Sequence, residues 1–284
     1  MRKALVVLNI NAGRKKAIKY KKLLLKFLRK KYDSYKLIDI EQLNNEQTNL
    51  FDDIIAVGGD GTVNKVLPYI INTDKTLAII PCGTANLLAA KLGISTNIKK
   101  AISIIEKGRK EKIDIISINN KPCILRFGLG YDADIITKTP QSIKNKFGYF
   151  SYFVAGILFA LRLNTRNYHI FYDNKEINTE ASCIIIANAA NMYKNWISVC
   201  KNDKLNDGLM DIFIFKTNNP IVFGFEILNI LLNRKINNAR AMYFNALNLQ
   251  IRNNWTMCHI DGEKQKFKED LIFKIINKAI NVYY

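Results

Sequence analysis

The chain has 284 residues, of which 49% are hydrophobic and 24% are charged, so it is expected to be globular and the composition excludes a disordered protein. Its formal net charge of +19 favours acidic partners such as nucleotides or an anionic membrane surface, and we expect no nucleic acid among them. Five widely spaced cysteines without a Cys-x-x-Cys pair indicate neither a zinc site nor a disulfide framework. Free thiols are typical of a reducing cytosol, and the longest apolar stretch, residues 149–161, is shorter than the roughly 20 residues of a membrane span. The sequence therefore indicates a cytoplasmic protein that associates peripherally with a membrane.

The first 110 residues alternate between short apolar runs and helical patterns, which predicts a parallel sheet with helices on both faces. In such sheets the carboxyl ends of the strands share one edge, where ligands bind. We therefore expect the loops at 9–13, 58–62 and 81–86 to converge there. Strands are predicted at 4–10, 35–40, 54–57 and 76–80, and helices at about 15–31, 41–50, 63–71 and after residue 86.

The loop within IIAVGGDGTVN, residues 54–64, has the pattern of a phosphate-binding turn. Glycines let a backbone come close to a ligand, and a following helix offers unpaired N–H groups. Asp60 places a carboxylate in the middle of this loop, where it would repel a phosphate unless a cation or a hydroxyl group lay between them. This favours phosphate chemistry over simple phosphate binding, while an ordinary tight turn between a strand and a helix remains the alternative.

After Lys112 short strand patterns dominate, and two helical stretches at about 146–162 and 220–232 interrupt them. This change predicts a second domain that is mostly antiparallel β-structure. We place the first domain at residues 1–120 and the second at 121–284, and the last residues could return to the first domain. The strands are expected at 113–118, 123–129, 168–173, 182–189, 210–215, 246–251 and 255–260.

Two motifs, GGDGT at 58–62 and PCGTANLLA at 81–89, resemble those of the bacterial diacylglycerol kinase-like lipid kinases, a family that includes sphingosine and ceramide kinases. LNINAG at 8–13 is similar to the family's Asn-Pro-x-Ser-Gly loop, although Ile10 and Ala12 depart from it. Further similar segments follow in the same order along the chain, and the resemblance covers nearly all of it. These segments are RFGLGYDADI at 126–135, LNDGLMDIFIF at 205–215 and IDGE at 260–263.

The resemblance implies a nucleotide domain of the NAD-kinase and phosphofructokinase type, followed by a β-sandwich that offers the acceptor. It also implies that ATP is the phosphoryl donor and lies between the two domains. Carried over residue by residue, the nucleotide-binding positions are Asn9, Gly13, Gly58, Gly59, Asp60, Gly61, Thr62, Asn64, Gly83, Thr84 and Asn86.

The resemblance further implies a Mg²⁺ held by the side chain of Asp207 and by the backbone carbonyl oxygens of Lys204 and Leu209. Mg²⁺ prefers oxygen ligands and keeps several waters, so one carboxylate and two carbonyls are a reasonable set. Read from its residues alone, Asn206-Asp207-Gly208 is equally well a tight turn between two strands.

A second pair of carboxylates, Asp261 and Glu263, could take a proton from an acceptor hydroxyl group. By resemblance, Glu263 is the proton acceptor in the bacterial lipid kinases, whereas in the sphingosine kinases the matching residue is Asp60. We expect Glu263 to be the base, with Asp60 orienting the site and binding Mg²⁺ through water. His169 and His259 fall on strand patterns and are interpreted as structural.

The expected function is that of an ATP-dependent lipid kinase acting on diacylglycerol or a related lipid in phospholipid metabolism. The expected partners are ATP, a lipid acceptor and the surface of an anionic membrane, with a homodimer as the default assembly. An NAD kinase-like enzyme and a catalytically silent sensor of lipid or nucleotide are the alternatives. The family's glycine-rich loop reads NAANMYKNWISV at 188–199 and lacks the glycines, which leaves the identity of the lipid open.

Overall fold

The computed structural model describes residues 2–9, 16–138, 163–188, 191–193, 197–198, 204–232, 234, 236–252 and 257–284. Gly13, the predicted helix at 146–162 and half of the loop at 188–199 lie outside these residues. The chain divides into two compact units, which are residues 1–113 with 278–284, and residues 114–277.

The first unit is built on a parallel sheet with strand order β2-β1-β3-β4-β18. Its central strands β3 and β4 are buried along their whole length, which explains their continuous apolar runs. The bounds of the strands are β1 Lys3–Leu8, β2 Ser34–Asp39, β3 Asp53–Gly58, β4 Thr76–Pro81 and β18 Leu271–Tyr283.

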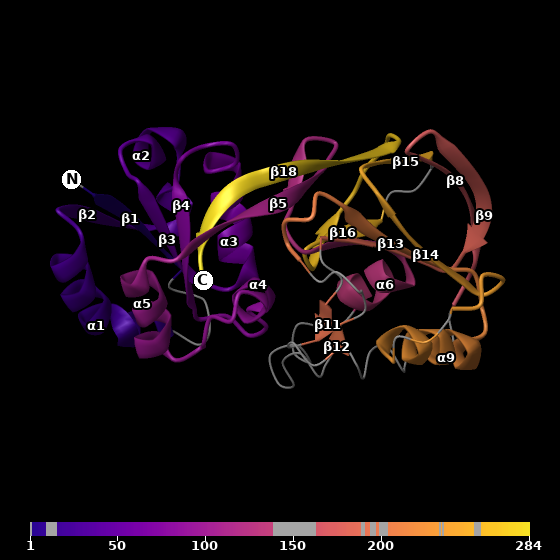
Figure 1. The fold of residues 1–284 in the computed structure, drawn as a ribbon, viewed down its shortest axis with the longest axis horizontal. Coiled ribbons are helices and arrows are strands. Elements are labelled where there is room, and N and C mark those ends of the chain that lie inside the picture. The colour runs from indigo at the N-terminus through magenta and orange to yellow at the C-terminus, as the bar shows by residue number, and fades with distance from the viewer. Residues whose placement is uncertain are drawn as a thin grey trace. The chain divides into compact units, whose positions relative to one another are not determined.

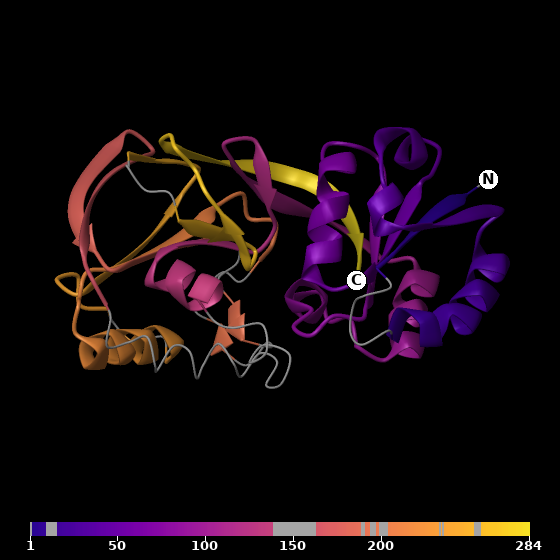
Figure 2. The ribbon, with the colours of Figure 1, turned by 180° about the vertical axis from the view of Figure 1, so that it is seen from behind.

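Helices cover both faces of this sheet, with α1 and α5 on one face and α3 on the other (Figures 1 and 2). The lysine-rich α1 buries Leu24, Phe27 and Leu28, so its apolar side packs into the core of the unit. The bounds are α1 Lys16–Lys31, α2 Asn45–Asn49, α3 Asp60–Val66, α4 Leu87–Lys91 and α5 Ile98–Lys107, with short 3-10 helices η1 Ile40–Gln42 and η2 Leu67–Tyr69.

The second unit is a sandwich of two mostly antiparallel sheets. The first, which we call the β10 sheet, has the strand order β14-β13-β10-β7-β16-β17. The second, which we call the β15 sheet, contains the first half of β18 followed by β15, β8 and β9, and β5 and β6 lie on the other side of β18. The bounds are β5 Lys110–Ile118, β6 Lys121–Cys123, β7 Arg126–Gly130, β8 Arg166–Tyr172, β9 Lys175–Ala181, β10 Cys183–Ala187, β13 Met210–Phe215, β14 Ala241–Ala246, β15 Asn248–Arg252, β16 Cys258–Ile260 and β17 Glu263–Gln265; β11 Asn191–Tyr193 and β12 Ile197–Ser198 form a separate pair.

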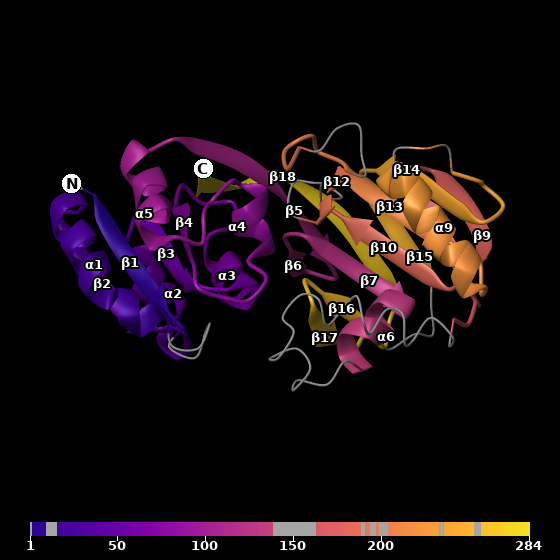
Figure 3. The same ribbon diagram turned by 90° about the horizontal axis from the view of Figure 1, so that it is seen from below.

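The core of the sandwich lies between the two sheets. Alternate side chains of the β10 sheet, such as Phe127 and Ile212, meet Ile251 and Phe273 of the β15 sheet. The outer face of the β10 sheet is also buried, because α6 (Tyr131–Lys138) and α9 (Pro220–Leu231) contribute to a second apolar cluster over it. Figure 3 shows α9 lying over β13 and β10.

The predicted fold class, a parallel α/β region followed by an antiparallel β-sandwich, is confirmed. The predicted domain boundary after residue 120 falls in the turn between β5 and β6. In the structure, the chain passes from the first unit to the second within β5, after residue 113, and returns within β18, after residue 277. These two strands are long enough to belong to both units. The helix predicted from residue 63 in fact begins at Asp60. The elements that were not predicted include α5, α6, β9, β11, β12, β14, β17 and β18.

No helix of the described residues is long and apolar enough to cross a membrane. The described cysteines Cys82, Cys123, Cys183 and Cys258 are buried and form no disulfide, as the cysteine spacing predicts.

Candidate functional site

Three loops of the first unit converge where β1, β3 and β4 end. The carbonyl oxygen of Gly58 accepts hydrogen bonds from the backbone N–H groups of Cys82 at 2.8 Å and Gly83 at 3.3 Å. The side-chain amide of Asn9 donates to Thr62 Oγ1 at 3.1 Å, and its backbone N–H donates to the carbonyl of Val57 at 3.1 Å. The predicted convergence of the loops is therefore confirmed for their described residues.

The glycines of these loops are required by the approach of one loop to the other. A Cβ atom on Gly83 would lie 2.5 Å from the Cα atom of Gly59, and a Cβ on Gly58 would lie 2.0 Å from Thr62 Oγ1. Both distances are too short for a side chain. Gly59 and Gly83 thus allow the two loops to come into contact, while Gly58 leaves room for the Thr62 side chain of its own loop.

The carboxylate of Asp60 does not point into its own loop as the sequence suggested. It accepts hydrogen bonds from the N–H groups of Leu87 at 3.1 Å and Leu88 at 3.3 Å, at the start of α4. These N–H groups have no partner within the helix, and a carboxylate is favoured at that end of a helix. Asp60 therefore ties the GGDG loop to the PCGTAN loop.

Asn86 and Asn64 complete the set of polar side chains at this edge. Asn86 adopts a left-handed backbone conformation, and its amide accepts from the Gly83 N–H at 2.8 Å and donates to the Gly83 carbonyl at 2.7 Å. Thr84 lies exposed on the same turn. The Oδ1 atom of Asn64 is buried without a hydrogen-bond partner among the described residues. A buried acceptor of this kind is stabilised by any ligand that donates to it.

In the second unit, Asp207 lies exposed in the turn before β13. Its Oδ1 atom accepts from the N–H of Leu209 at 3.1 Å, and the N–H of Gly208 donates to Asp114 Oδ2 at 2.7 Å. Partial burial raises the pKa of Asp207, and the nearby carboxylates of Asp211 and Asp114 raise it further. This accumulation of negative charge would be relieved by a bound cation.

The predicted ligands of this cation, Asp207 with the carbonyls of Lys204 and Leu209, belong to one turn of six residues. Among the described residues no three His, Cys, Asp or Glu side chains gather into a metal-binding group. Any metal held here would therefore take backbone oxygens and water beside Asp207, which is the donor set that Mg²⁺ accepts.

Glu263 begins β17, directly after a two-residue hairpin turn formed by Asp261 and Gly262. Both turn residues have positive φ angles, 49° and 86°, and Asp-Gly is a preferred pair for such a turn. The carboxylate of Asp261 accepts three backbone N–H groups at 2.8–2.9 Å, from Ile124, Leu125 and Arg126. Asp261 therefore anchors the hairpin, while Glu263 is exposed.

A buried His259–Asp132 pair supports the same hairpin. His259 Nε2 lies 2.6 Å from Asp132 Oδ2, and the N–H of Gly262 donates to His259 Nδ1 at 3.2 Å. Burial would raise the pKa of Asp132, but Arg126 and His259 outweigh it and lower that pKa to about 2. The geometry agrees with the structural role expected for His259, and no sequence signal linked it to Asp132.

The structure brings Asn9, Gly58–Thr62 and Gly83–Asn86 together, whereas the two carboxylates of the second unit belong to different elements. Asp207 precedes β13 and Glu263 begins β17, and β10, β7 and β16 lie between these strands.

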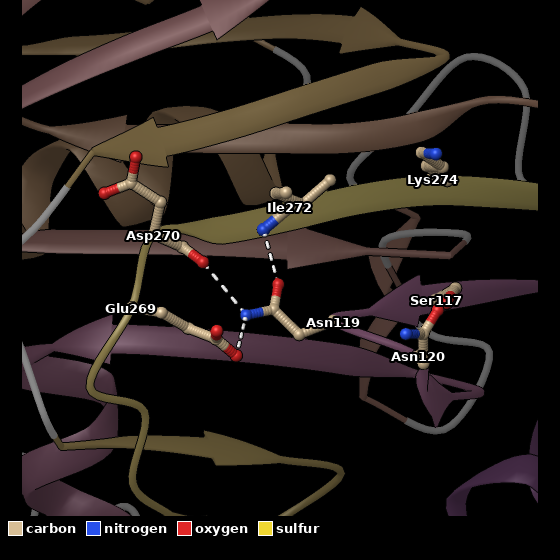
Figure 4. A pocket seen from close by; sticks show the side chains of 7 residues that line it. All are labelled: Ser117, Asn119, Asn120, Glu269, Asp270, Ile272 and Lys274. Atoms are coloured by element: carbon tan, nitrogen blue, oxygen red, sulfur yellow. Dashed lines mark hydrogen bonds between the residues drawn. The ribbon is translucent and has the colours of Figure 1, made fainter.

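One pocket of the second unit, of about 420 Å³, contains none of the predicted site residues (Figure 4). Asn119, in the turn between β5 and β6, donates to Glu269 Oε1 at 3.0 Å and to the Asp270 carbonyl at 2.9 Å, and accepts from the N–H of Ile272 at 2.7 Å. These bonds hold the turn against the start of β18. The polar side chain at the pocket therefore has a structural role, as it connects two elements of the fold.

Two family models match the chain. The diacylglycerol kinase catalytic domain matches residues 3–118, and the YegS C-terminal NAD kinase beta sandwich-like domain matches residues 126–283. The chain is 30% identical over 217 residues to a diacylglycerol kinase of Bacillus subtilis, and this alignment covers 75% of this chain and 71% of that protein. It is 32% identical over 167 residues to the probable lipid kinase YegS of Escherichia fergusonii, covering 57% of this chain and 56% of that protein.

The chain spans about half the length of several curated relatives that it matches. A crystal structure of a Bacillus anthracis protein assigned as a diacylglycerol kinase superposes with a TM-score of 0.82 at 20% identity, covering 100% of this chain and 95% of that one. At this level of identity the match shows a shared fold.

Proposed function

The chain belongs to the family defined by the diacylglycerol kinase catalytic domain and its YegS-type C-terminal domain, and from this we propose that it is an ATP-dependent lipid kinase. It transfers the γ-phosphoryl group of ATP to the hydroxyl group of diacylglycerol or a related lipid. The convergence of the 58–62 and 81–86 loops with Asn9 is the observation that carries this proposal. An NAD kinase-like activity is the competing function.

The nucleotide is proposed to bind at the edge of the parallel sheet, beside the glycine loops and the side chains of Asn9, Asn64 and Asn86. The buried, unpartnered Oδ1 of Asn64 supports a ligand with a donor group at this place. Asp60 holds the two glycine loops in one arrangement and so fixes these contacts before ATP binds.

A Mg²⁺ ion is proposed at Asp207 and the carbonyls of Lys204 and Leu209, where it would supply positive charge. The negative charge of Asp211 and Asp114 in the neighbourhood of the partly buried Asp207 supports this assignment.

Glu263 is proposed as the proton acceptor for the lipid hydroxyl group. It is exposed at the end of a hairpin that Asp261 and His259 hold in place, so its carboxylate is accessible while its backbone is anchored. As the hydroxyl oxygen bonds to the γ-phosphorus and the bond to the leaving oxygen of ADP breaks, the hydroxyl proton passes to the carboxylate.

The acceptor lipid, contact with an anionic membrane and a homodimer are further parts of the proposal. Diacylglycerol is favoured because the B. subtilis relative carries that name. A long-chain base, phosphatidylglycerol and an undecaprenol-like alcohol are the other candidates.

Incubation of the protein with labelled ATP, Mg²⁺ and either NAD or a panel of these lipids tests the proposal. We expect label in one of the lipids and none in NAD. Label in NAD alone would replace the lipid kinase by the competing function. Failure to label any acceptor, with ATP bound, would favour a silent sensor.

Replacement of Asp207 by alanine is expected to remove a Mg²⁺-dependent rise in melting temperature of about 2–4 °C and to lower Mg²⁺-dependent turnover. Asp207→Asn separates a metal role from a turn role, because asparagine can still accept from the Leu209 N–H but carries no charge. A metal role predicts that both variants lose the Mg²⁺ shift. A Mg²⁺ shift equal to that of the wild type in either variant would contradict the metal assignment.

A further inference from the structure

Helix α9 has an unusual distribution of side chains for a helix at the surface. One side packs on the β10 sheet through Phe223 and Ile230, which are 6% and 5% exposed, and the N-terminus is capped by the side chain of Asn219. The opposite side, which should be polar in a helix facing water, is also apolar.

The exposed side of α9 and the residue after it form an apolar stripe of Ile221, Phe225, Leu228 and Leu232. These side chains are 69%, 59%, 45% and 50% exposed, and they include four of the nine large hydrophobic side chains that are exposed in the described part of the chain. The spacing of four, three and four residues places them along one line of the helix. The only charged residue of α9, Glu226, is 1% exposed, so no charge interrupts the stripe.

Basic residues lie near α9, at its two ends and beside its buried Glu226. Lys216 lies before the N-cap, and its Nζ donates to the carbonyl of Asn238 at 3.0 Å. Arg234 follows the last turn, where its backbone N–H donates to the carbonyl of Asn229 at 2.8 Å, and its side chain is exposed. Arg240, which is half exposed, lies 3.9 Å from the buried Glu226 carboxylate.

We propose that the α9 stripe is the surface through which this protein inserts into an anionic lipid bilayer. A 12-residue helix is about 18 Å long, too short to span a bilayer but suited to lying in its interface. An apolar face that enters the headgroup region, with cationic side chains beside it, is the arrangement that binds peripheral proteins to anionic lipids. The purpose of this contact rests on the proposed lipid kinase activity, whereas the contact itself does not.

Charge favours a bilayer over a second copy of this chain as the occupant. A symmetric dimer would place the same patch of both copies face to face. The interface would then contain Lys216, Arg234 and Arg240 of both copies, and like charges brought into one interface oppose association. Anionic headgroups, in contrast, complement all three.

The main test compares two double variants in sedimentation with vesicles of phosphatidylcholine and phosphatidylglycerol, without ATP. Phe225→Ser/Leu228→Ser is expected to lower the constant for partition from water into the vesicles at least about tenfold. The reason is that the two apolar side chains that transfer from water into the bilayer are lost. The matched control is Leu247→Ser/Ile272→Ser, whose side chains are 49% and 46% exposed away from α9 and which should bind as the wild type does. Equal binding by the α9 variant and the wild type would overturn the proposal.

Insertion is measured directly by a tryptophan at the stripe. Phe225→Trp is expected to be quenched by vesicles with brominated acyl chains, whereas Leu247→Trp is expected to show no quenching beyond that of the two native tryptophans. Arg234→Gln should weaken binding about fivefold on phosphatidylglycerol vesicles and leave it unchanged on phosphatidylcholine alone. Absence of quenching at residue 225 under conditions of full binding would overturn the proposal.

These outcomes are distinct from failure of the proposed activity. Loss of vesicle binding in the α9 variant, with no lipid phosphorylated by any variant, would reject the kinase and retain the surface. Lipid phosphorylation with unchanged vesicle binding would reject the surface and retain the kinase. A dimer that dissociates in the α9 variant, with unchanged vesicle binding, would assign the stripe to a second copy and reject the proposal.

Discussion

Replacement of Glu263 by glutamine is expected to lower lipid phosphorylation about a thousandfold and to leave ATP binding nearly intact. Glutamine has the shape of glutamate but cannot take a proton from the acceptor hydroxyl group. Because Asp261 and His259 hold the hairpin through other atoms, the exchange should not disturb the fold. Initial rates with the identified lipid, combined with nucleotide binding by calorimetry, measure the two effects separately.

Asp60→Asn is the comparison that decides which carboxylate is the base. Leu87 and Leu88 donate to different carboxylate oxygens of Asp60, so an asparagine at residue 60 can keep one of these two hydrogen bonds, and the two glycine loops should remain connected through it. If Glu263 is the base, Glu263→Gln removes the ionisation of this carboxylate from the pH profile of turnover. Asp60→Asn then lowers the turnover rate but leaves that ionisation in the pH profile. Undiminished turnover in Glu263→Gln would assign the proton transfer to another group.

Replacement of Asp53 by alanine is expected to destabilise the first unit by about 3 kcal/mol. Asp53 is fully buried at the start of β3 and accepts hydrogen bonds from Tyr32 OH at 2.7 Å and Tyr283 OH at 2.8 Å, and it forms an ion pair with Arg2 at 2.8 Å. Burial and the carboxylate raise the pKa of both tyrosines, so their hydroxyl groups remain donors. Alanine would leave both hydroxyl groups buried without an acceptor.

Urea unfolding measures this loss, and the neighbouring Asp52 provides the control. Asp52 is exposed and its carboxylate accepts a hydrogen bond from the Lys3 N–H at 2.8 Å, so Asp52→Ala should cost less than about 1 kcal/mol. Asp53→Asn should fall between the two, because it retains an acceptor and loses the charge. Equal midpoints for Asp53→Ala and Asp52→Ala would show that the buried network contributes little.

The parallel strands of the first unit could be predicted because each is a short, fully buried apolar run bounded by turn residues. The missed strand β18 shows where such patterns end. Its first half alternates between buried and exposed side chains in the β15 sheet, and its second half is buried beside β4. The burial pattern changes near Lys278, which has a φ angle of 50°. Because of this change, no single hydrophobic period runs through the whole strand, and the sequence pattern does not reveal it.

The convergence of the loops at 9, 58–62 and 81–86 could be predicted from the sequence, but not all of their contacts could. The close packing of the two glycine loops depends on the distance between two strands, which sequence spacing does not reveal. The Asp53 network was missed for a similar reason, because its partners lie 51, 21 and 230 residues away along the chain. Motif resemblance supplied the roles of Asp207 and Glu263, which remain predictions.

The return of β18 to the parallel sheet imposes an order on folding during synthesis. Residues 278–284 contribute to the first unit a strand beside β4, the Tyr283 hydroxyl bonded to Asp53, and the Ala279 carbonyl bonded to the Asn72 N–H. A ribosome that has made residues 1–270 has therefore translated almost the whole sandwich while the first unit still lacks a strand. Until then one edge of β4 is unpaired, and this makes the late nascent chain the stage at which aggregation or chaperone binding is expected.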